Sequence, residues 1–386
     1  MVVCPDKFAG TMTAEQAAQA IADGWRTGDP SATLTVLPQA DGGPGFLDAV
    51  EAGVGGRLVA VATVDPFGRP VTAGVLLVGD TAYIESAQAC GRGLLDAGEL
   101  DPLRASSYGV GLLLAAAVET GARTVVVGLG GSATNDGGAG ALAALGAAPV
   151  DRAGLTLPYG ALALRDVVGL NARPRLRPVN LVAAVDVVNP LTGPAGATAV
   201  YGPQKGLGPA QAPVLDDALT RYAQALRQLP GAPADLAARP GGGAAGGLGA
   251  ALLALGARVE SGATLVRTLT GLDDAVSFAD LVVTGEGSLD QQSASGKVVS
   301  GVAAAARAAG VPCLALAGRV SLGATGLDAL GLVAAYGLVD EPGGPDQAMI
   351  RPGPALRALA ARVATGWAGV GNGQTSASVG WIKQRR

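Results

Sequence analysis

The sequence contains no histidine among its 386 residues. This absence excludes Ser-His-Asp and Cys-His catalytic machinery and removes the commonest neutral nitrogen ligand of zinc. Any general base must therefore be Asp, Glu, Lys, Tyr or a thiolate. The three cysteines, Cys4, Cys90 and Cys313, lie far apart in the sequence, which disfavours both a disulfide framework and a structural zinc site.

Charged residues are also scarce, at 15% of the chain, and the formal net charge is −4. Because no basic excess exists to meet a phosphate backbone, we predict no nucleic-acid partner. No basic N-terminal segment precedes an apolar run, and the Gly- and Ala-rich stretch 241–257 is shorter than the roughly 20 apolar residues that a membrane-spanning helix needs. We therefore expect no signal peptide, no membrane partner and a cytoplasmic location.

Short apolar runs alternate with Ala- and Leu-rich helical stretches, a pattern typical of an α/β protein with largely parallel sheets. Residues 58–64, 71–77 and 81–85 are β-branched runs separated by turn residues, which predicts an antiparallel meander. The length indicates two domains, and the two ends of the chain have similar βαβ patterns. We expect a doubly wound α/β domain of residues 1–57 plus 277–370, an inserted α/β domain of residues 58–276, and a loose tail over 371–386.

The segment best suited to chemistry is a glycine-rich turn after the strand predicted over 124–127. Six glycines (Gly128, Gly130, Gly131, Gly137, Gly138, Gly140) interleave with Ser132, Thr134, Asn135 and Asp136. Glycines let the backbone approach a ligand and direct successive N–H groups into one concavity. A helix beginning after Gly138 adds its positive end, so the segment predicts a phosphate-binding loop. The alternative is a glycine-rich surface turn capped by Asp136.

The same segment fits the dinucleotide-binding fingerprint loosely, through Gly128-x-Gly130-x-x-Ala133. That fingerprint needs a helix to start at once, and here the polar residues 134–138 intervene. No lysine follows the glycines, so the segment is also not a Walker A loop.

Further candidate residues lie in acid-containing loops after predicted strands. Glu286 and Asp290 are expected just past the end of a strand, where carboxylates suit Mg²⁺, and Lys297 opens a helix, where a lysine suits phosphate. The alternative is two solvated acids and a solvated lysine. Asp186 ends an apolar strand and is a base, a metal ligand or a strand-end cap.

The remaining candidates also have a plain structural alternative. Asp41 precedes Gly42 and Gly43, which is also the composition of a simple turn, and Asp6 with Lys7 suits either a small anionic substrate or a local ion pair. Four acid-containing loops, several glycine-rich loops and the lack of histidine together favour phosphoryl transfer, which needs positioning, Mg²⁺, positive charge and a carboxylate.

Eight motifs follow one another along the chain. They are Pro5-Asp-Lys-Phe-x-Gly-Thr11, Ala40-Asp-Gly-Gly43, Ser107-Tyr-Gly-Val-Gly111, the Gly128–Gly140 segment, Asn189-Pro-Leu-Thr-Gly193, Gly202-Pro-Gln-Lys-Gly206, Gly243-Ala-Ala-Gly-Gly-Leu-Gly249 and Thr284-Gly-Glu-Gly-x-Leu-Asp290. Their order resembles that of the bacterial-type glycerate kinases (glycerate kinase type 1 family) over roughly residues 3–340. The resemblance implies ATP-dependent phosphorylation of D-glycerate with Mg²⁺, with 2-phosphoglycerate as the favoured product. It also implies two different α/β domains with the active site in the cleft between them.

The resemblance implies a role for each matching residue. By this resemblance, the catalytic residues are Asp186, Asp290 and Lys297, and the substrate-binding residues are Asp6, Lys7, Asp41 and Lys205. The residues implied to bind ATP are Gly130, Gly131, Ser132, Thr134, Asn135, Asp136, Gly137 and Gly138. The implied metal ligands are Asp136 and Glu286. The base is left open between Asp186 and Asp290, with Asp186 first.

Three positions depart from the family pattern. Ala9, Pro44 and Ser288 stand where Lys, Glu and Arg are common, and each change removes a charged group. These losses keep open a catalytically silent nucleotide- or metabolite-binding protein, while the dinucleotide-like spacing keeps open an NAD-dependent dehydrogenase. The oligomeric state, a homodimer included, is also left open.

Overall fold

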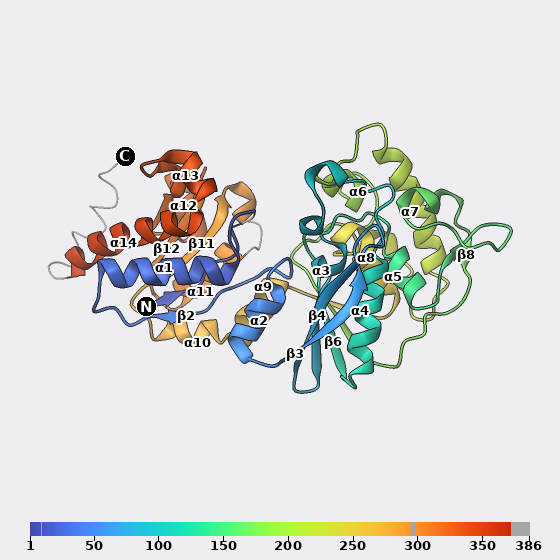
Figure 1. Cartoon of the computed structure of the whole chain (residues 1–386), viewed down its shortest axis with the longest axis horizontal. Coiled ribbons are helices and arrows are strands. Elements are labelled where there is room, and N and C mark those ends of the chain that lie inside the picture. The colour runs from blue at the N-terminus through green and yellow to red at the C-terminus, as the bar shows by residue number, and fades with distance from the viewer. Residues whose placement is uncertain (9, 295–297, 372–386) are drawn as a thin grey trace. The chain divides into compact units, whose positions relative to one another are not determined.

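The computed structural model describes residues 1–8, 10–294 and 298–371. The chain divides into two compact units. Unit 1 consists of Met1–Ala40, Asp48–Val54 and Ala263–Arg386, and unit 2 consists of Asp41–Leu47 and Gly55–Gly262. Each unit has its own sheet flanked by helices (Figure 1), which confirms the expected α/β class with two different α/β parts.

Unit 1 is built on a five-stranded sheet in the order β13-β12-β11-β1-β2, in which every pair is parallel. Its strands are β1 (Val2–Val3), β2 (Thr35–Val36), β11 (Val282–Leu289), β12 (Cys313–Val320) and β13 (Ala334–Gly337). Its helices are α1 (Ala14–Gly28), α10 (Leu272–Ser277), α11 (Val298–Ala308), α12 (Ala324–Leu330), α13 (Gly344–Ile350) and α14 (Pro352–Gly371). Two helices, α2 (Phe46–Val54) and α9 (Gly262–Leu269), begin in unit 2 and continue into unit 1.

Both faces of the unit 1 sheet are covered. Val3 and Val283 enter one hydrophobic core, whereas their neighbours Val2 and Val282 enter the other. On the first of these faces α1 and α14 lie side by side (Figure 1), so close that a Cβ atom on Gly24 would lie 2.2 Å from the Arg357 carbonyl oxygen. Successive side chains of a strand point to opposite faces of the sheet, and both faces are covered here. The four valines of β1 and β11 are therefore all buried, which explains why these segments are apolar without interruption.

Unit 2 is built on a six-stranded sheet in the order β10-β9-β6-β5-β4-β3. Its strands are β3 (Arg57–Val64), β4 (Pro70–Val78), β5 (Thr81–Glu85), β6 (Thr124–Gly128), β9 (Asn180–Ala184) and β10 (Arg258–Glu260), with a separate pair, β7 (Pro149–Val150) and β8 (Gly169–Leu170). Its helices are α3 (Ala87–Cys90), α4 (Tyr108–Glu119), α5 (Ala139–Ala144), α6 (Ala197–Tyr201), α7 (Ala212–Leu226) and α8 (Ala244–Ala254).

The unit 2 sheet has two halves with different pairing. Strands β3, β4 and β5 form antiparallel pairs, which confirms the expected meander. Strands β5, β6, β9 and β10 run parallel to one another. The carboxyl ends of these four strands therefore meet at one edge of the sheet, where open α/β sheets bind ligands.

The strand that we expected to end before Glu286 is longer than expected. Strand β11 runs from Val282 to Leu289, so Glu286 lies inside it and not past its end. Glycine permits this extension, because a Cβ atom on Gly285 would lie 2.0 Å from the Leu316 carbonyl oxygen of β12. The ladder then continues through the pair of Glu286 with Ala317.

The long glycine-rich segment turns sharply at the start of α8. Ala245, Gly246 and Gly247 have positive φ values of 50°, 67° and 93°, so right-handed helical backbone runs from Leu248 to Ala254. The chain returns to unit 1 at Ala263, whereas we expected the second part of that domain to begin at residue 277. Residues 41–47 belong to unit 2. The tail over 372–386 lies outside the described residues.

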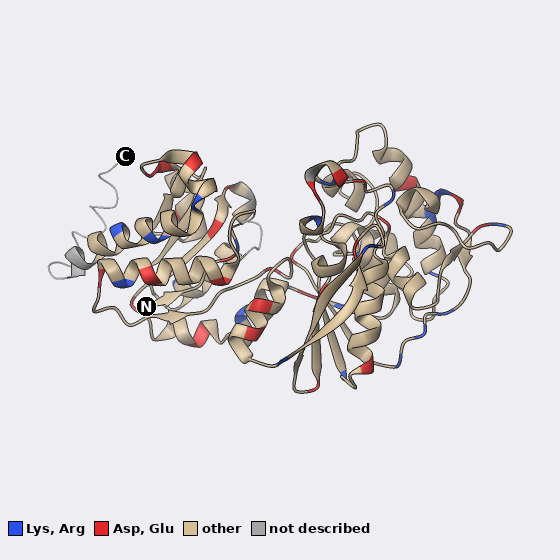
Figure 2. Cartoon of the chain, in the orientation of Figure 1, with Lys and Arg blue, Asp and Glu red and all other residues tan. Residues whose placement is uncertain are grey.

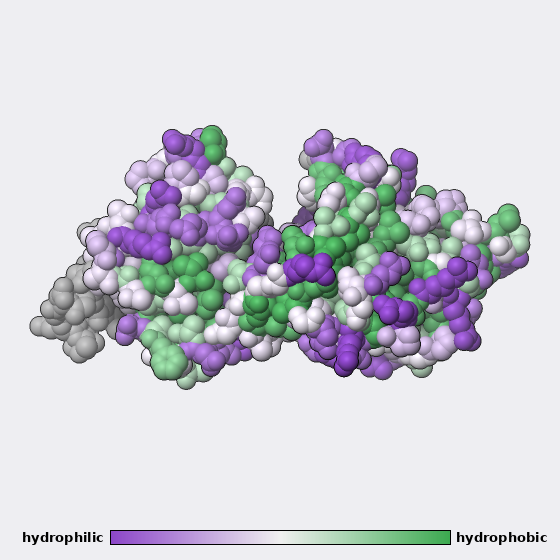
Figure 3. Space-filling view, turned by 60° about the horizontal axis from the view of Figure 1, so that its bottom comes forward, coloured by the Kyte–Doolittle hydropathy of each residue, from purple (hydrophilic) through white to green (hydrophobic). Residues whose placement is uncertain are grey.

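In the described part of the chain, Lys and Arg are not concentrated on one helix or strand, in keeping with the low content of charged residues. Figure 2 shows Lys and Arg scattered singly along both units. Figure 3 shows apolar areas interrupted by hydrophilic residues on the face in view, and the most exposed large apolar side chains, Phe278, Val188 and Ile350, come from distant segments. Among the residues that the structure describes, no helix combines the length and the apolar character needed to cross a bilayer.

Candidate functional site

The segments that follow the parallel strands of unit 2 are in direct contact. A Cβ atom on Gly128 would lie 2.6 Å from the Gly42 carbonyl oxygen, and one on Gly130 would lie 2.6 Å from Gly43 Cα. A Cβ atom on Gly42 would lie 2.6 Å from the Ala184 carbonyl oxygen at the end of β9. Only glycine allows three backbones to approach this closely. The structure therefore brings together the Asp41 turn, the glycine-rich loop after β6 and the end of β9.

Asp41 and Asp186 both lie beside the turn after β10. The Ser261 hydroxyl donates a hydrogen bond of 2.6 Å to Asp186 Oδ1. The next residue, Gly262, packs against Asp41, where an added Cβ atom would lie 2.6 Å from the Asp41 carbonyl oxygen. Asp41 Oδ1 accepts a hydrogen bond of 3.1 Å from the Gly43 N–H, which fixes the turn. Two carboxylates predicted from separate loops thus occupy the same edge of the sheet.

The glycine-rich loop presents backbone donors without acceptors. Within residues 130–136, all of which the structure describes, no hydrogen bond is donated by the N–H groups of Gly130, Gly131, Ser132, Thr134, Asn135 and Asp136. The Ala133 N–H instead bonds to the Cys90 carbonyl oxygen at 2.7 Å. Buried backbone N–H groups are rarely left without an acceptor, so this loop is suited to an anion such as a phosphate group.

Asp136 has a different environment from the metal ligand that we expected. Its side chain is completely buried, and Oδ2 accepts hydrogen bonds from the Ser107 N–H (2.8 Å), the Ser107 hydroxyl (2.9 Å) and the Gly140 N–H (3.1 Å). Oδ1 accepts from the Gly138 N–H at 3.1 Å. Burial raises the pKa of Asp136, and these hydrogen bonds oppose the rise. The contacts make Asp136 the cap of α5 and its link to the residue before α4.

The second glycine-rich segment, residues 243–249, packs against the glycine-rich loop after β6. The Gly246 carbonyl accepts a hydrogen bond of 2.9 Å from the Gly137 N–H. A Cβ atom on Gly246 would lie 1.9 Å from the Thr134 carbonyl oxygen. The side chain of Asn135 is buried, and its amide group donates to Thr198 Oγ1 at 2.9 Å. Gly137 and Gly138, with φ values of 65° and 78°, then turn the chain into α5.

Lys205 contacts this loop from the turn before α7. It ends the short 3₁₀ helix Pro203–Lys205 and is only 3% exposed. Its Nζ donates to Ser132 Oγ at 2.9 Å and to the Thr134 carbonyl oxygen at 2.6 Å. Burial lowers the pKa of Lys205 to about 8; Cys90 and Asp136 oppose this change, and Arg92 adds to it.

Sequence reasoning assigned no site role to three residues of this edge, although Ser107 stands in one of the family motifs. Glu85, at the end of β5, accepts hydrogen bonds from the Gly45 N–H (3.0 Å) and the Leu47 N–H (3.4 Å). Ser107 bridges Asp136 and the Ala141 N–H, and Ser261 donates to Asp186. For Glu85, its position at the end of a predicted strand was the signal that could have indicated a site role. The roles of Ser107 and Ser261 depend on partners far away in the sequence, so local sequence does not indicate them.

In unit 1, the structure brings four other predicted residues to the neighbouring strands β1 and β11. The Asp6 N–H bonds to the Gly285 carbonyl oxygen at 2.8 Å, which places Asp6 beside the segment that carries Glu286. Asp6 and Glu286 are buried, and Lys7 Nζ lies 3.5 Å from Asp6 Oδ1. Asp290 directly follows β11, as expected, and its N–H bonds to Ser293 Oγ at 3.1 Å.

Two positions from the sequence analysis, Lys297 and Ala9, lie outside the described residues. Pro44, at a departure from the family pattern, packs on the glycine-rich loop: a Cβ atom on Gly131 would lie 2.7 Å from Pro44 Cγ. Ser288, at another departure, lies within β11, and its hydroxyl donates to Asp290 Oδ2 at 3.4 Å. Among the residues described, no cluster of three or more His, Cys, Asp or Glu side chains is arranged to hold a metal ion.

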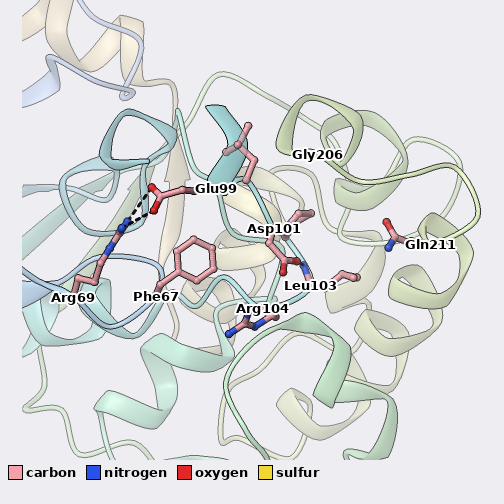
Figure 4. A pocket seen from close by; sticks show the side chains of 11 residues that line it. Phe67, Arg69, Glu99, Asp101, Leu103, Arg104, Gly206 and Gln211 are labelled. Carbon is pink, nitrogen blue, oxygen red and sulfur yellow. Dashed lines mark hydrogen bonds and ion pairs between the residues drawn. The ribbon is translucent and has the colours of Figure 1, made fainter. Parts of the chain in front are cut away.

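A cavity of about 610 Å³ in unit 2 contains none of the predicted site residues. Its wall includes Arg69 and Glu99, which form an ion pair at 2.7 Å, and Phe67 (Figure 4). Gly206, the residue after Lys205, also lines it. The cavity therefore extends to the turn that carries Lys205.

Comparison with known proteins shows the family to which the chain belongs. A family model described as the glycerate kinase family matches residues 1–368. The glycerate kinase of Halalkalibacterium halodurans is 40% identical over 368 residues, covering 94% of this chain and 96% of that protein. The glycerate 2-kinase of Escherichia coli K12 is 40% identical over 346 residues, covering 88% of each chain. A crystal structure under the name glycerate kinase 2, from Salmonella typhimurium LT2, superposes with a TM-score of 0.77 at 38% identity and covers 95% of this chain and 98% of its own. The chain belongs to the glycerate kinase family.

Proposed function

We propose that this protein transfers the γ-phosphoryl group of ATP to D-glycerate by direct in-line transfer and releases ADP and 2-phosphoglycerate. Family membership supports the reaction class. The observation that carries the proposal further is the edge of unit 2, where N–H groups without acceptors lie in a loop packed against the Asp41 turn. Phosphoryl transfer depends mainly on such positioning and on electrostatic stabilisation.

The glycine-rich loop is proposed to hold the phosphate groups of ATP. Backbone N–H groups bind phosphate oxygens without a lysine side chain, and the loop leads into the N-terminus of α5, which begins at Ala139. Asp136 maintains the loop from within, because it accepts the N–H groups of Gly138 and Gly140. This role replaces the metal ligand that was expected at Asp136.

Asp186 is the proposed base. The hydroxyl group of glycerate that attacks the γ-phosphorus atom loses its proton to the Asp186 carboxylate, while the bond from phosphorus to the β-phosphate oxygen breaks. The hydrogen bond from Ser261 holds this carboxylate in one orientation. Asp290, which follows β11, is the second candidate. Asp6 and Lys7 are proposed to bind glycerate, because the lysine ammonium group suits its carboxylate.

Mg²⁺ usually takes one or two protein carboxylates and completes its shell with phosphate oxygens and water. The carboxylate of Asp136 does not fit this use, because Oδ2 accepts a hydrogen bond from the Ser107 N–H and Oδ1 accepts one from the Gly138 N–H. Glu286 has the hard oxygen donors that fit, and it is the proposed ligand. When bound, the ion would neutralise charge on the phosphate groups.

The test uses the purified chain with ATP, MgCl₂ and D-glycerate. The expected result is ADP release that depends on D-glycerate, with 2-phosphoglycerate identified by ³¹P and ¹H NMR of the product. L-Glycerate and a reaction without acceptor serve as controls. Nucleotide binding without any turnover of hydroxy acids would support the catalytically silent alternative, and 3-phosphoglycerate as the product would overturn the proposed position of transfer.

A further inference from the structure

Lys205 is the one described lysine buried against the glycine-rich loop, and its contacts are unusual for a ligand-binding lysine. Its Nζ bonds to a side chain and a carbonyl of the loop, Ser132 Oγ and Thr134 O, at 2.9 and 2.6 Å. The residue between them, Ala133, bonds to the Cys90 carbonyl oxygen. Acceptor atoms of the loop are thus occupied by groups of the protein, while the flanking N–H groups are left without acceptors.

We infer that Lys205 is a positioning residue of the nucleotide-binding loop: its ammonium group holds Ser132 Oγ and the Thr134 carbonyl so that the neighbouring N–H groups remain available to phosphate oxygens, and its charge strengthens their attraction for the anion. This assignment differs from the substrate-binding role implied by the family resemblance. It rests on the proposed function in one respect, namely that the anion is the phosphate chain of a nucleotide.

The turn that carries Lys205 is held tightly in place. Gly206 has a φ of 92°, and a Cβ atom there would lie 2.9 Å from the Leu100 carbonyl oxygen. A Cβ atom on Gly202 would lie 2.4 Å from the Thr198 carbonyl oxygen. Because backbone atoms crowd both ends of the turn, Lys205 has little freedom to move toward a substrate. Its fixed position favours a role in shaping the loop.

The electrostatic surroundings make this role sensitive to pH. The titratable and charged groups that act on Lys205 are Cys90 on α3, Arg92 after it and Asp136 in the loop. Burial raises the pKa of the Cys90 thiol to about 12, so that thiol stays neutral while Lys205 titrates. With its pKa lowered to about 8, Lys205 is charged at pH 7 and mostly neutral at pH 9.5. An anion bound in the loop raises this pKa again, so its affinity must fall as the pH rises.

The experiment measures ADP binding by calorimetry at fixed Mg²⁺ concentration between pH 7.5 and 9.5. If bound phosphate raises the pKa of Lys205 by one unit, the affinity of the unchanged protein falls about sixfold over this range. Lys205→Met is expected to bind ADP about tenfold more weakly at pH 7.5 and to show little further change up to pH 9.5. Arg221→Met, at an exposed position of α7, is the control and should behave as the unchanged protein.

Ser132→Ala separates geometry from charge. It removes one acceptor but keeps the ammonium group, so binding should weaken while the dependence on pH remains. Thermal melting of each variant establishes that it is folded. If Lys205→Met does not fold, Ser132→Ala decides, since ADP binding as tight as in the unchanged protein overturns the inference and weaker binding supports it.

Two results would contradict the inference and leave the kinase proposal intact. One is ADP affinity that does not change with pH and is unaffected by Lys205→Met. The other is a Lys205→Met enzyme with a raised KM for glycerate alone and an unchanged KM for ATP, because that result would make Lys205 a substrate ligand. Conversely, pH-dependent ADP binding without any glycerate turnover would refute the proposed reaction and still support the role of Lys205.

Discussion

The Ser261 hydroxyl donates a hydrogen bond of 2.6 Å to Asp186 Oδ1 across two neighbouring strands. The contact follows from the sheet, because β9 and β10 are parallel and pair Ala184 with Glu260, just before these two residues. Such a bond orients a carboxylate more firmly than a solvated loop allows.

Replacing Asp186 by Asn should leave the fold intact and lower kcat by about two to four powers of ten, because the amide cannot take the hydroxyl proton. A coupled assay of ADP release measures this, with the thermal midpoint as a check of folding. Ser261→Ala should lower kcat much less, since it removes the orienting bond and keeps the base. Asp290→Asn is the matched comparison, and a larger loss there would move the base to Asp290.

Gly246→Ala should destabilise unit 2 by more than about 4 kcal/mol or prevent folding, because the new methyl group overlaps the Thr134 carbonyl and φ is 67°. Urea unfolding measures the effect. Gly231→Ala is the control, because Gly231 has a φ of 85° with no atom within 4 Å of the added methyl group. It should cost only about 1 kcal/mol. Equal stability of the two variants would contradict the packing of the two glycine-rich segments.

Glu85→Gln should lower the stability of unit 2 by about 1–2 kcal/mol, because the charge-assisted hydrogen bonds from the Gly45 and Leu47 N–H groups become neutral ones. Urea unfolding followed by circular dichroism measures this change. Glu51→Gln, at an exposed position of α2, is the control and should stay within about 0.5 kcal/mol of the unchanged protein. A variant at position 85 as stable as this control would show that the carboxylate does not anchor the start of α2.

Tyr222→Phe should leave the stability unchanged or increase it by about 1 kcal/mol, because the buried hydroxyl of Tyr222 has no partner among the described residues. Thermal unfolding measures the change. Tyr201→Phe is the control, since its hydroxyl donates to Asn189 Oδ1 at 2.6 Å, and its loss should cost about 1 kcal/mol. A clear loss of stability at position 222 would indicate a water-mediated bond there.

Local signals made much of the fold predictable. Thr13 predicts the start of α1, and the structure shows the complete capping box, with Gln16 N–H on Thr13 Oγ1 at 3.1 Å and the reciprocal bond at 3.0 Å. The β-branched runs 58–64, 71–77 and 81–85 form the predicted meander. These elements depend on neighbours in the sequence, which is the information that one sequence contains.

The parts that sequence reasoning did not reach depend on distant partners. The structural role of Asp136 requires Ser107 on another loop, and the extension of β11 through Gly285 and Glu286 requires β12. Likewise, nothing near Ala245 in the sequence indicates that a non-glycine residue adopts a φ of 50° there. Tertiary contact, and not local preference, determines each of these features.

The placement of β1 between β2 and β11 also affects the order in which the chain can assemble during translation. Strand β1 lacks one of its two partners until Val282 has been synthesised, whereas all segments of unit 2 are complete at Gly262. The nascent chain therefore contains every strand of unit 2 before β1 can complete its pairing. Unit 2 thus has all its segments before unit 1 does, although β1 precedes every strand of unit 2 in the chain.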